Sequence, residues 1–268
     1  MFKFEFMRTA FMVGGLLAVI IPLIGVVVVF KRMSMIGDAL SHVSLSGIAI
    51  GLIVNVNPLL GAIVMSLIAA ISIEFIQKRF GKYSELAIAI IMSFGIGLSA
   101  ILLGFVSNPA NFNSFLFGSI VAIGGTDNML AVILSIVVIA ASLYFYREFF
   151  FIAFDETSAH LSGISVNRMN LIFMILTAIT VSVASRIVGA LIVSSLMVLP
   201  TACAMQVGKS YKSTMLYAVA FSLLFVWGGL ASSYYLDLAP GGTIVMTGVV
   251  VLVLLLLYKS ITRSIRKL

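Results

Sequence analysis

Hydrophobic residues run along this chain in long stretches that only short polar connections interrupt. Nine apolar segments can be marked out, at about 9–30, 36–54, 58–77, 85–106, 127–146, 168–185, 187–207, 213–235 and 242–258. Most are close to the roughly 20 residues that an α-helix needs to cross a hydrocarbon core. Backbone groups in lipid must be paired internally, and runs of this length fit helices rather than barrel strands. The pattern predicts an all-α, polytopic transmembrane helical bundle of about eight or nine spans.

The seventh segment, 187–207, differs from the others in composition. It contains Gly189, a serine pair and Pro200, and a single arginine separates it from the sixth segment. Glycine and proline disturb a helix, and a membrane protein tolerates irregular backbone where it is buried in protein. The composition therefore favours a broken or re-entrant helix in this segment.

Small residues recur in other segments, as in SLSG (44–47) and GIG (95–97). They permit close contacts between helices, and helix association in lipid depends on such packing and not on the hydrophobic effect. No linker, internal repeat or low-complexity segment is visible. Residues 1–268 are therefore predicted to form a single transmembrane domain.

Composition and charge support a membrane protein. Hydrophobic residues make up 62% of the chain and charged residues 9%, and the mean hydropathy is +1.24. The net charge of +7 would suggest nucleic acid for a soluble protein, but here loop topology explains it and no nucleic-acid partner is expected. Lysines and arginines gather in alternate connections, at 31–32, 78–82, 147–168 and 209–212, and at the C-terminus. The positive-inside rule places these parts in the cytoplasm.

An acid and an imidazole interrupt the second segment. Asp38 and His42 are four residues apart in GDALSHVSLSG (37–47), so a helix would place them on one face. Ionisable side chains in a membrane segment are costly and mark a pathway or a site by default. A carboxylate and an imidazole suit a divalent first-row cation such as zinc or manganese, although an Asp–His hydrogen bond that only fixes packing would give the same pattern. Two ligands do not complete a coordination shell, so a partner helix or another subunit would supply the rest.

The depth of this pair follows from its neighbours in the sequence. Asp38 comes six residues after Arg32, which is about 9 Å along a helix, and Arg32 lies in a connection predicted to be cytoplasmic. The pair is therefore expected in the inner half of the membrane. An unwound start of the second segment would instead let the two side chains reach deeper.

A polar island, FDETSAHLSGISVNR (154–168), separates the fifth and sixth segments on the predicted cytoplasmic side. Asp155 suits the N-cap of a short helix through His160, and Gly163 suits its C-terminal end. A membrane subunit would present such a helix to a soluble partner, but an ordinary surface loop also fits. Further on, VGKS (207–210) lacks the glycine five residues earlier that a phosphate-binding loop needs, so no nucleotide site is predicted.

Several stretches resemble motifs of one family, the membrane permeases of bacterial ABC importers for zinc and manganese. RMSMIGDALSHVSLSGIAIGL (32–52) is similar to the family's second-helix motif, and FDETSAHLSGI (154–164) to its cytoplasmic coupling segment. RIVGALIVSSLMVLPTACA (186–204) is similar to a later motif, and SNPANFNSFLFGSIVAI (107–123) has the family's character. The motifs follow one another in the expected order, and the likeness covers nearly the whole chain.

This resemblance implies a function and a set of partners. It implies a multi-pass permease of the bacterial inner membrane that forms a homodimer and receives its ion from an extracytoplasmic metal-binding protein. A separate ATP-binding cassette subunit would hydrolyse ATP, so the chain itself is expected to be no enzyme and to hold no permanent cofactor. Zn²⁺ or Mn²⁺ would be its cargo, and Asp38 and His42 its pore metal site. The ATPase would contact the coupling segment, at about 154–166, through Phe154, Asp155, Glu156, His160, Leu161 and Gly163.

The residues leave the metal and the energy source open. SHVSLSGIAIGLIVNVNP (41–58) is more similar to zinc permeases than to manganese ones, so zinc is favoured, with manganese or iron as the alternative. A rival from another class is a proton-coupled secondary metal transporter, in which Asp38 and His42 would relay protons without an ATPase. An intramembrane hydrolase with zinc at the same pair is a weaker rival, because no further ligand or nucleophile stands at a recognisable spacing.

Overall fold

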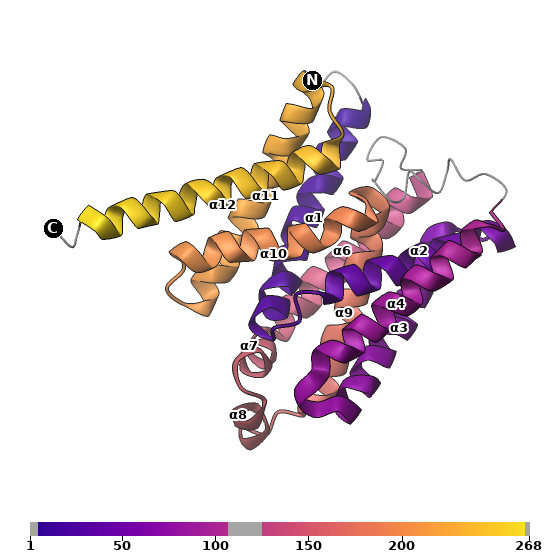
Figure 1. Ribbon diagram of the computed structural model, residues 1–268, viewed down its shortest axis with the longest axis horizontal. Helices are drawn as coiled ribbons and strands as arrows, with labels where there is room; N and C mark the ends of the chain where they lie inside the picture. The colour runs from indigo at the N-terminus through magenta and orange to yellow at the C-terminus, as the bar shows by residue number, and fades with distance from the viewer. Residues whose placement is uncertain (1–4, 107–124, 266–268) are drawn as a thin grey trace.

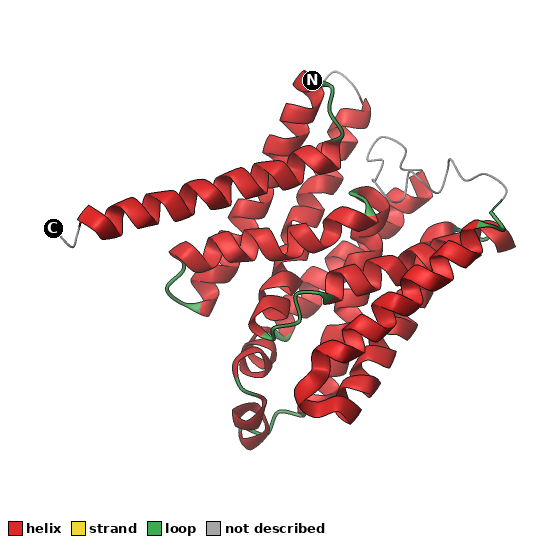
Figure 2. Ribbon diagram, viewed as in Figure 1, coloured by secondary structure: helices red, strands yellow, loops and turns green. Residues whose placement is uncertain are grey.

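The structure is a computed structural model that describes residues 5–106 and 125–265. All regular structure within these residues is helical (Figure 2). The elements are α1 (Glu5–Phe30), α2 (Ile36–Val54), α3 (Pro58–Phe80), the 3₁₀ turn η1 (Gly81–Tyr83), α4 (Ser84–Leu103), α6 (Gly125–Tyr144), α7 (Tyr146–Phe154), α8 (Glu156–Leu161), α9 (Val166–Ile187), α10 (Ala190–Val207), α11 (Tyr211–Leu236) and α12 (Pro240–Ile265).

Seven helices of the described chain are long and apolar enough to cross a membrane, and the bent pair α6–α7 would make an eighth span. This confirms the prediction of an all-α bundle with about eight or nine spans. The break is not where the composition placed it, because the two parts of the bent pair meet at 70° around Phe145. Residues 190–207 form one helix, with Pro200 inside it. The irregular backbone of that segment is concentrated before the helix, at Gly189, whose φ of 105° suits glycine alone.

Local sequence explains how the second and third spans are joined. Asn55 ends α2 in the left-handed conformation, at φ 58°, which asparagine adopts more readily than most residues. Asn57 then caps α3, and its side chain accepts a hydrogen bond from the Leu59 amide at 2.8 Å. Pro58 occupies the first helical position, where a missing amide hydrogen costs nothing. The sequence NVNP is therefore a tight reversal between two antiparallel helices.

Three helices form the centre of the bundle. In α1, α2 and α9 about two thirds or more of the most apolar stretch is buried, at 72%, 72% and 67%, whereas the values for α4 and α12 are 22% and 11%. Helices α3 and α4 pack on one side of α2, and α10 and α11 pack against α1, with α12 outermost (Figure 1). The exposed sides of α4 and α12 are apolar, as a surface in contact with lipid requires.

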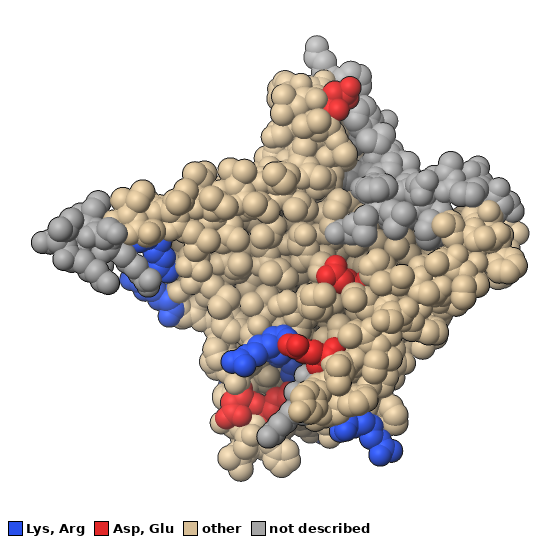
Figure 3. Space-filling model, in the orientation of Figure 1, with Lys and Arg blue, Asp and Glu red and all other residues tan. Residues whose placement is uncertain are grey.

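Most lysines and arginines of the described residues lie at one end of the bundle, whereas Arg8 and Arg186 lie near the opposite ends of α1 and α9. Lys31, just after α1, is bonded to Glu156 of α8, and Lys259 of α12 donates to the Gln206 carbonyl at the end of α10. Lys78, at the end of α3, lines a cavity that also contains Lys31. On the face shown in Figure 3, the visible Lys and Arg side chains lie near α7, near the connection between α3 and α4, and near the end of α12. We call this region, including α8, the basic end.

Candidate metal centre and coupling segment

Helix α2 approaches its neighbours closely because small residues stand at the contacts. A Cβ atom added to Gly37 would lie 3.2 Å from the Ser194 Cα of α10, and one added to Gly95 of α4 would lie 2.7 Å from the Val43 amide nitrogen. Gly47 meets a glycine of α3 backbone to backbone. A hydroxyl–hydroxyl hydrogen bond of 3.0 Å, from Ser44 to a serine of α9, closes a further side. Helix α2 is thus held by α3, α4, α9 and α10.

Asp38 and His42 occupy the face of α2 that these contacts leave partly open. Between Ile36 and Gly51 only Asp38, His42 and Ile50 are not buried. Since successive helical residues are about 100° apart, the shared face of the acid and the imidazole lies between the sides that contact α4 and α10. The pair therefore lies on one face of α2, as predicted. Both side chains are partly accessible on a helix that is buried over most of its length.

The pair lies close to the basic end. Helix α2 is regular from Ile36 onwards, and Asp38 falls in its first turn, where the helix dipole favours a carboxylate. His42 lies one turn further along the helix. The second segment therefore begins as a regular helix soon after Arg32, and the unwound start that was the alternative is not observed.

A single chain offers few ligands at this position. The described residues contain no group of three or more His, Cys, Asp and Glu side chains that could hold a metal ion together. Zinc in proteins takes about four ligands. Asp38 and His42 could therefore bind a metal ion only with water or with groups from another chain, an arrangement that suits transient binding better than permanent binding.

The coupling segment forms the short helix that its sequence predicts. The Asp155 carboxylate accepts hydrogen bonds from the Thr157 amide at 2.9 Å and from the Ser158 hydroxyl, and these bonds lower the pKa of Asp155. At the other end Gly163 takes a φ of 80°, and its amide donates to the His160 carbonyl at 3.0 Å. The N-cap at Asp155 and the role of Gly163 are thus confirmed.

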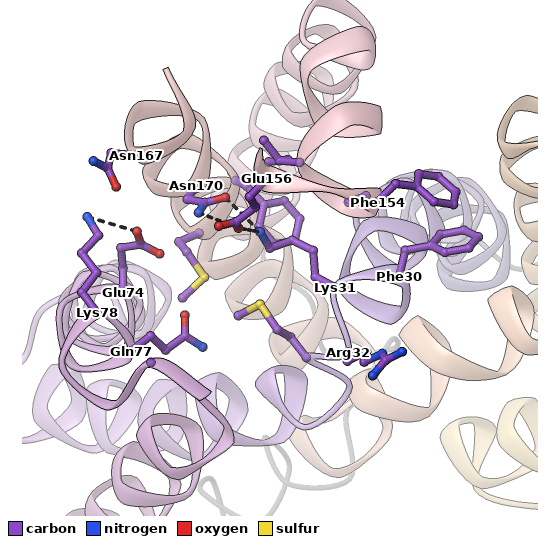
Figure 4. A pocket seen from close by; sticks show the side chains of 16 residues that line it. Phe30, Lys31, Arg32, Glu74, Gln77, Lys78, Phe154, Glu156, Asn167 and Asn170 are labelled. Atoms are coloured by element: carbon purple, nitrogen blue, oxygen red, sulfur yellow. Dashed lines mark hydrogen bonds and ion pairs between the residues drawn. The ribbon is translucent and has the colours of Figure 1, made fainter. Parts of the chain in front are cut away.

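All six residues predicted to meet an ATPase are exposed at the surface. Leu161 is 83% exposed and Phe154 is 56% exposed, and His160 is also open to solvent. Glu156 is exposed as well, but its carboxylate accepts hydrogen bonds from Lys31 and Asn170 (Figure 4). Sequence reasoning did not find these two partners, because no local pattern relates positions that are 125 residues apart, as Lys31 and Glu156 are.

An open cavity of about 480 Å³ lies beside this contact. It is bounded by the α1–α2 turn, the end of α3 and the segments around α8, and its lining includes Lys31, Glu74, Gln77, Lys78 and Glu156 (Figure 4). Ends of helices that are distant in sequence therefore meet at one polar hollow at the basic end.

These features define the class of protein: a polytopic helical membrane protein with an acid–imidazole pair on a central helix and a short exposed helix at its basic end. The chain belongs to the ABC 3 transport family, whose family model matches residues 3–259. The resemblance drawn from the motifs is thereby confirmed, although one of the quoted stretches, 107–123, lies outside the described residues.

Individual relatives carry names from zinc and from manganese transport. The chain is 32% identical to the high-affinity zinc uptake system membrane protein ZnuB of Haemophilus influenzae, over 94% of this chain and 97% of that protein. It is 28% identical to the manganese transport system membrane protein MntC of Listeria monocytogenes, over 96% and 91%. A solved structure of PsaBC from Streptococcus pneumoniae in complex with Fab superposes with a TM-score of 0.84 at 28% identity, over 94% of this chain and 91% of that chain.

Proposed function

We propose that this chain is the membrane permease subunit of an ATP-driven importer for a divalent transition-metal ion. Family membership and the named relatives support a metal transport protein. The observation that carries the proposal is the position of Asp38 and His42, the two titratable residues of α2, on the partly open face of a helix that is buried over most of its length. A burial cost of this kind is usually retained only where the side chains act on a substrate or ion.

Zinc is the proposed cargo, with manganese or iron as the alternative. A carboxylate and an imidazole suit all three ions, so ligand type does not choose between them. The named zinc relative is slightly more similar than the manganese relative, at 32% against 28% identity. The similarity of residues 41–58 to zinc permeases points the same way.

The proposed partners are a second copy of this chain, an ATPase and a metal-binding protein. Two copies of the chain would bring two Asp38–His42 pairs together, and four ligands are what zinc takes. We assign ATP hydrolysis to a separate ATP-binding cassette subunit that docks on the exposed side of α8, and delivery of the ion to an extracytoplasmic metal-binding protein. The positive-inside rule then orients the basic end and the C-terminus towards the cytoplasm.

In the proposed mechanism ATP controls access to the pair. Closure of the ATP-binding subunits moves α8, and the helices around Asp38 and His42 rearrange so that the pair faces first one side of the membrane and then the other. The site must accept the ion and also release it. Two side-chain ligands per chain meet both demands better than a closed four-ligand structural site.

The test is metal uptake by cells that carry the variants Asp38→Asn and His42→Gln. Both variants should assemble at normal levels and lose accumulation of zinc, measured together with manganese and iron. Asp237→Asn is the matched control, because Asp237 is exposed and left-handed at the end of α11, a conformation that asparagine also adopts. Normal uptake by both site variants would refute the assignment. Uptake by the purified chain alone, driven by a proton gradient in liposomes, would instead establish the secondary transporter.

A further inference from the structure

We propose that Lys31, Glu156 and Asn170 form a link that transmits movement of α8 to the start of α2, and that they act as positioning residues for the metal pair. This inference rests on the proposed transport function and adds a route from the ATPase-docking helix to Asp38 and His42. The three residues come from three separate parts of the chain: the end of α1, the first turn of α8 and the first turns of α9.

The three side chains form a closed set of hydrogen bonds (Figure 4). The Lys31 ammonium donates to Glu156 Oε1 at 2.6 Å and to Asn170 Oδ1 at 3.0 Å. The Asn170 amide nitrogen donates to the same carboxylate oxygen at 3.0 Å. The Lys31 side chain is only 10% exposed, so its charge has lost most of its water and depends on these partners. The Glu156 side chain is 51% exposed, so the contact is shielded on the lysine side and open to water on the carboxylate side. Charge-assisted hydrogen bonds are stronger than those between neutral groups.

The contact with Lys31 keeps Glu156 ionised at neutral pH. Partial burial favours the neutral carboxyl of Glu156, but the hydrogen bond and the positive charge of Lys31 outweigh it and lower the pKa of Glu156. The ring contact between Phe30 and Phe154, with centroids 4.8 Å apart, lies directly beside the link in sequence. The end of α1 is therefore joined to the end of α7 by an aromatic contact and to the start of α8 by a polar contact.

The link is continuous with the helix that carries the metal pair. Lys31 begins the turn between α1 and α2, and Asp38 is seven residues further on. The turn is fixed by its own hydrogen bonds, from the Met33 amide to the Val28 carbonyl and from the Ile36 amide to the Met33 carbonyl, each 2.9 Å. Arg32 takes a left-handed φ of 58° within it. A turn that is held this tightly passes a displacement of Lys31 to α2 instead of absorbing it.

The same cavity contains a pair that serves as a control. Glu74 and Lys78 are 3.3 Å apart, but both lie on α3, four residues from each other. That pair joins no two elements, and removal of its charge should leave the relation between α8 and α2 unchanged. Comparison of the two pairs separates a link between elements from the general effect of charge in the cavity.

The experiment uses the complete importer, with its ATPase and binding protein, in liposomes. Zn²⁺ transport and ATP hydrolysis are measured together, with Mn²⁺ in parallel. We expect Lys31→Met, which lies outside the predicted ATPase contact, to assemble and to hydrolyse ATP, but to move about 2- to 30-fold fewer ions per ATP, the usual range for a mutated coupling contact. Glu156→Gln should lower the same ratio. The reversed pair Lys31→Glu with Glu156→Lys should recover much of the ratio, and Lys78→Met should match the unmodified importer.

Each other result overturns the link. An unchanged ratio of ions to ATP in both single variants would show that the contact stabilises the structure but transmits no movement. Loss of the assembled complex in Lys31→Met would assign the contact to structure and not to positioning. Failure of the unmodified complex to move either metal would refute zinc and manganese as the cargo of the proposed importer, a result that is distinct from failure of the link.

Discussion

The crossing of α2 and α3 depends on two glycines that face each other. A Cβ atom added to Gly47 would lie 2.7 Å from the carbonyl carbon of Gly61 and 2.9 Å from the Ala62 Cα. A Cβ atom added to Gly61 would lie 3.1 Å from the Gly47 carbonyl carbon. All of these atoms belong to the backbone, so no side chain can rotate away. We predict that Gly47→Ala forces the two helices apart and destabilises the protein.

The size of the effect follows from these distances. Carbon atoms pack at about 3.5 Å or more, and the contact of 2.7 Å is therefore short by roughly 0.8 Å. Overpacking of this kind costs about 1–3 kcal/mol, whereas replacing glycine by alanine within a helix stabilises the folded state by about 0.5–1 kcal/mol. Because the contacted atoms are backbone, the cost lies in the upper half of that range and the net loss is about 1–2.5 kcal/mol. At about 2–4 °C per kcal/mol, this lowers the unfolding temperature by roughly 2–10 °C.

The assay compares two identical chemical changes at different places. Gly97 on α4 is exposed, and a Cβ atom there would meet no heavy atom within 4 Å. Thermal unfolding of the purified protein in detergent micelles should therefore show Gly47→Ala below the unmodified protein and Gly97→Ala equal to it or above it. Equal unfolding temperatures for Gly47→Ala and Gly97→Ala would refute the reasoning, because the close contact would then carry no cost.

Two further predictions concern the ends of helices. Asp155→Ala should remove the cap of α8 and speed amide hydrogen exchange in residues 156–161 several-fold, whereas Asp155→Asn, which still accepts the cap bond, should not. The lowered pKa of Asp155, caused by its hydrogen bonds from Ser158 and Thr157, means that the charged cap is complete above the unfolded pKa of about 3.9 and is lost only as the pH falls through the lower folded value. Gly189→Ala should destabilise the α9–α10 junction by about 1–3 kcal/mol, because its φ of 105° strains any other residue. Gly242→Ala, at an open position, is the control, and thermal unfolding in micelles that showed equal losses would contradict the strain.

Local chemistry explains why much of the fold could be predicted from the sequence. Apolar runs must be helical in lipid, and their positions match the helices closely. The cap at Asp155 and the end at Gly163 depend on neighbours in sequence, and both were predicted. The face shared by Asp38 and His42 follows from helical geometry alone. Each of these features requires only a few consecutive residues.

Features that depend on distant residues could not be predicted in this way. Gly95 and Gly97 look alike in the sequence, yet one contacts the backbone of α2 and the other contacts nothing. No glycine or proline lies near the bend at Phe145, so no local pattern predicts the bend. The bond from Lys31 to Glu156 joins positions 125 residues apart, and its lysine looks like any basic residue at a membrane boundary.

The contacts of α2 also limit how the metal pair can move. Backbone contacts at Gly47 and Gly95 and the hydrogen bond of Ser44 leave α2 little freedom to rotate about its own axis, since close-packed interfaces shift between discrete arrangements and do not deform gradually. Asp38 and His42 lie on one uninterrupted helix, so any displacement carries them together. Alternating access in the proposed importer therefore changes which groups the pair faces, and not the distance between its own two ligands.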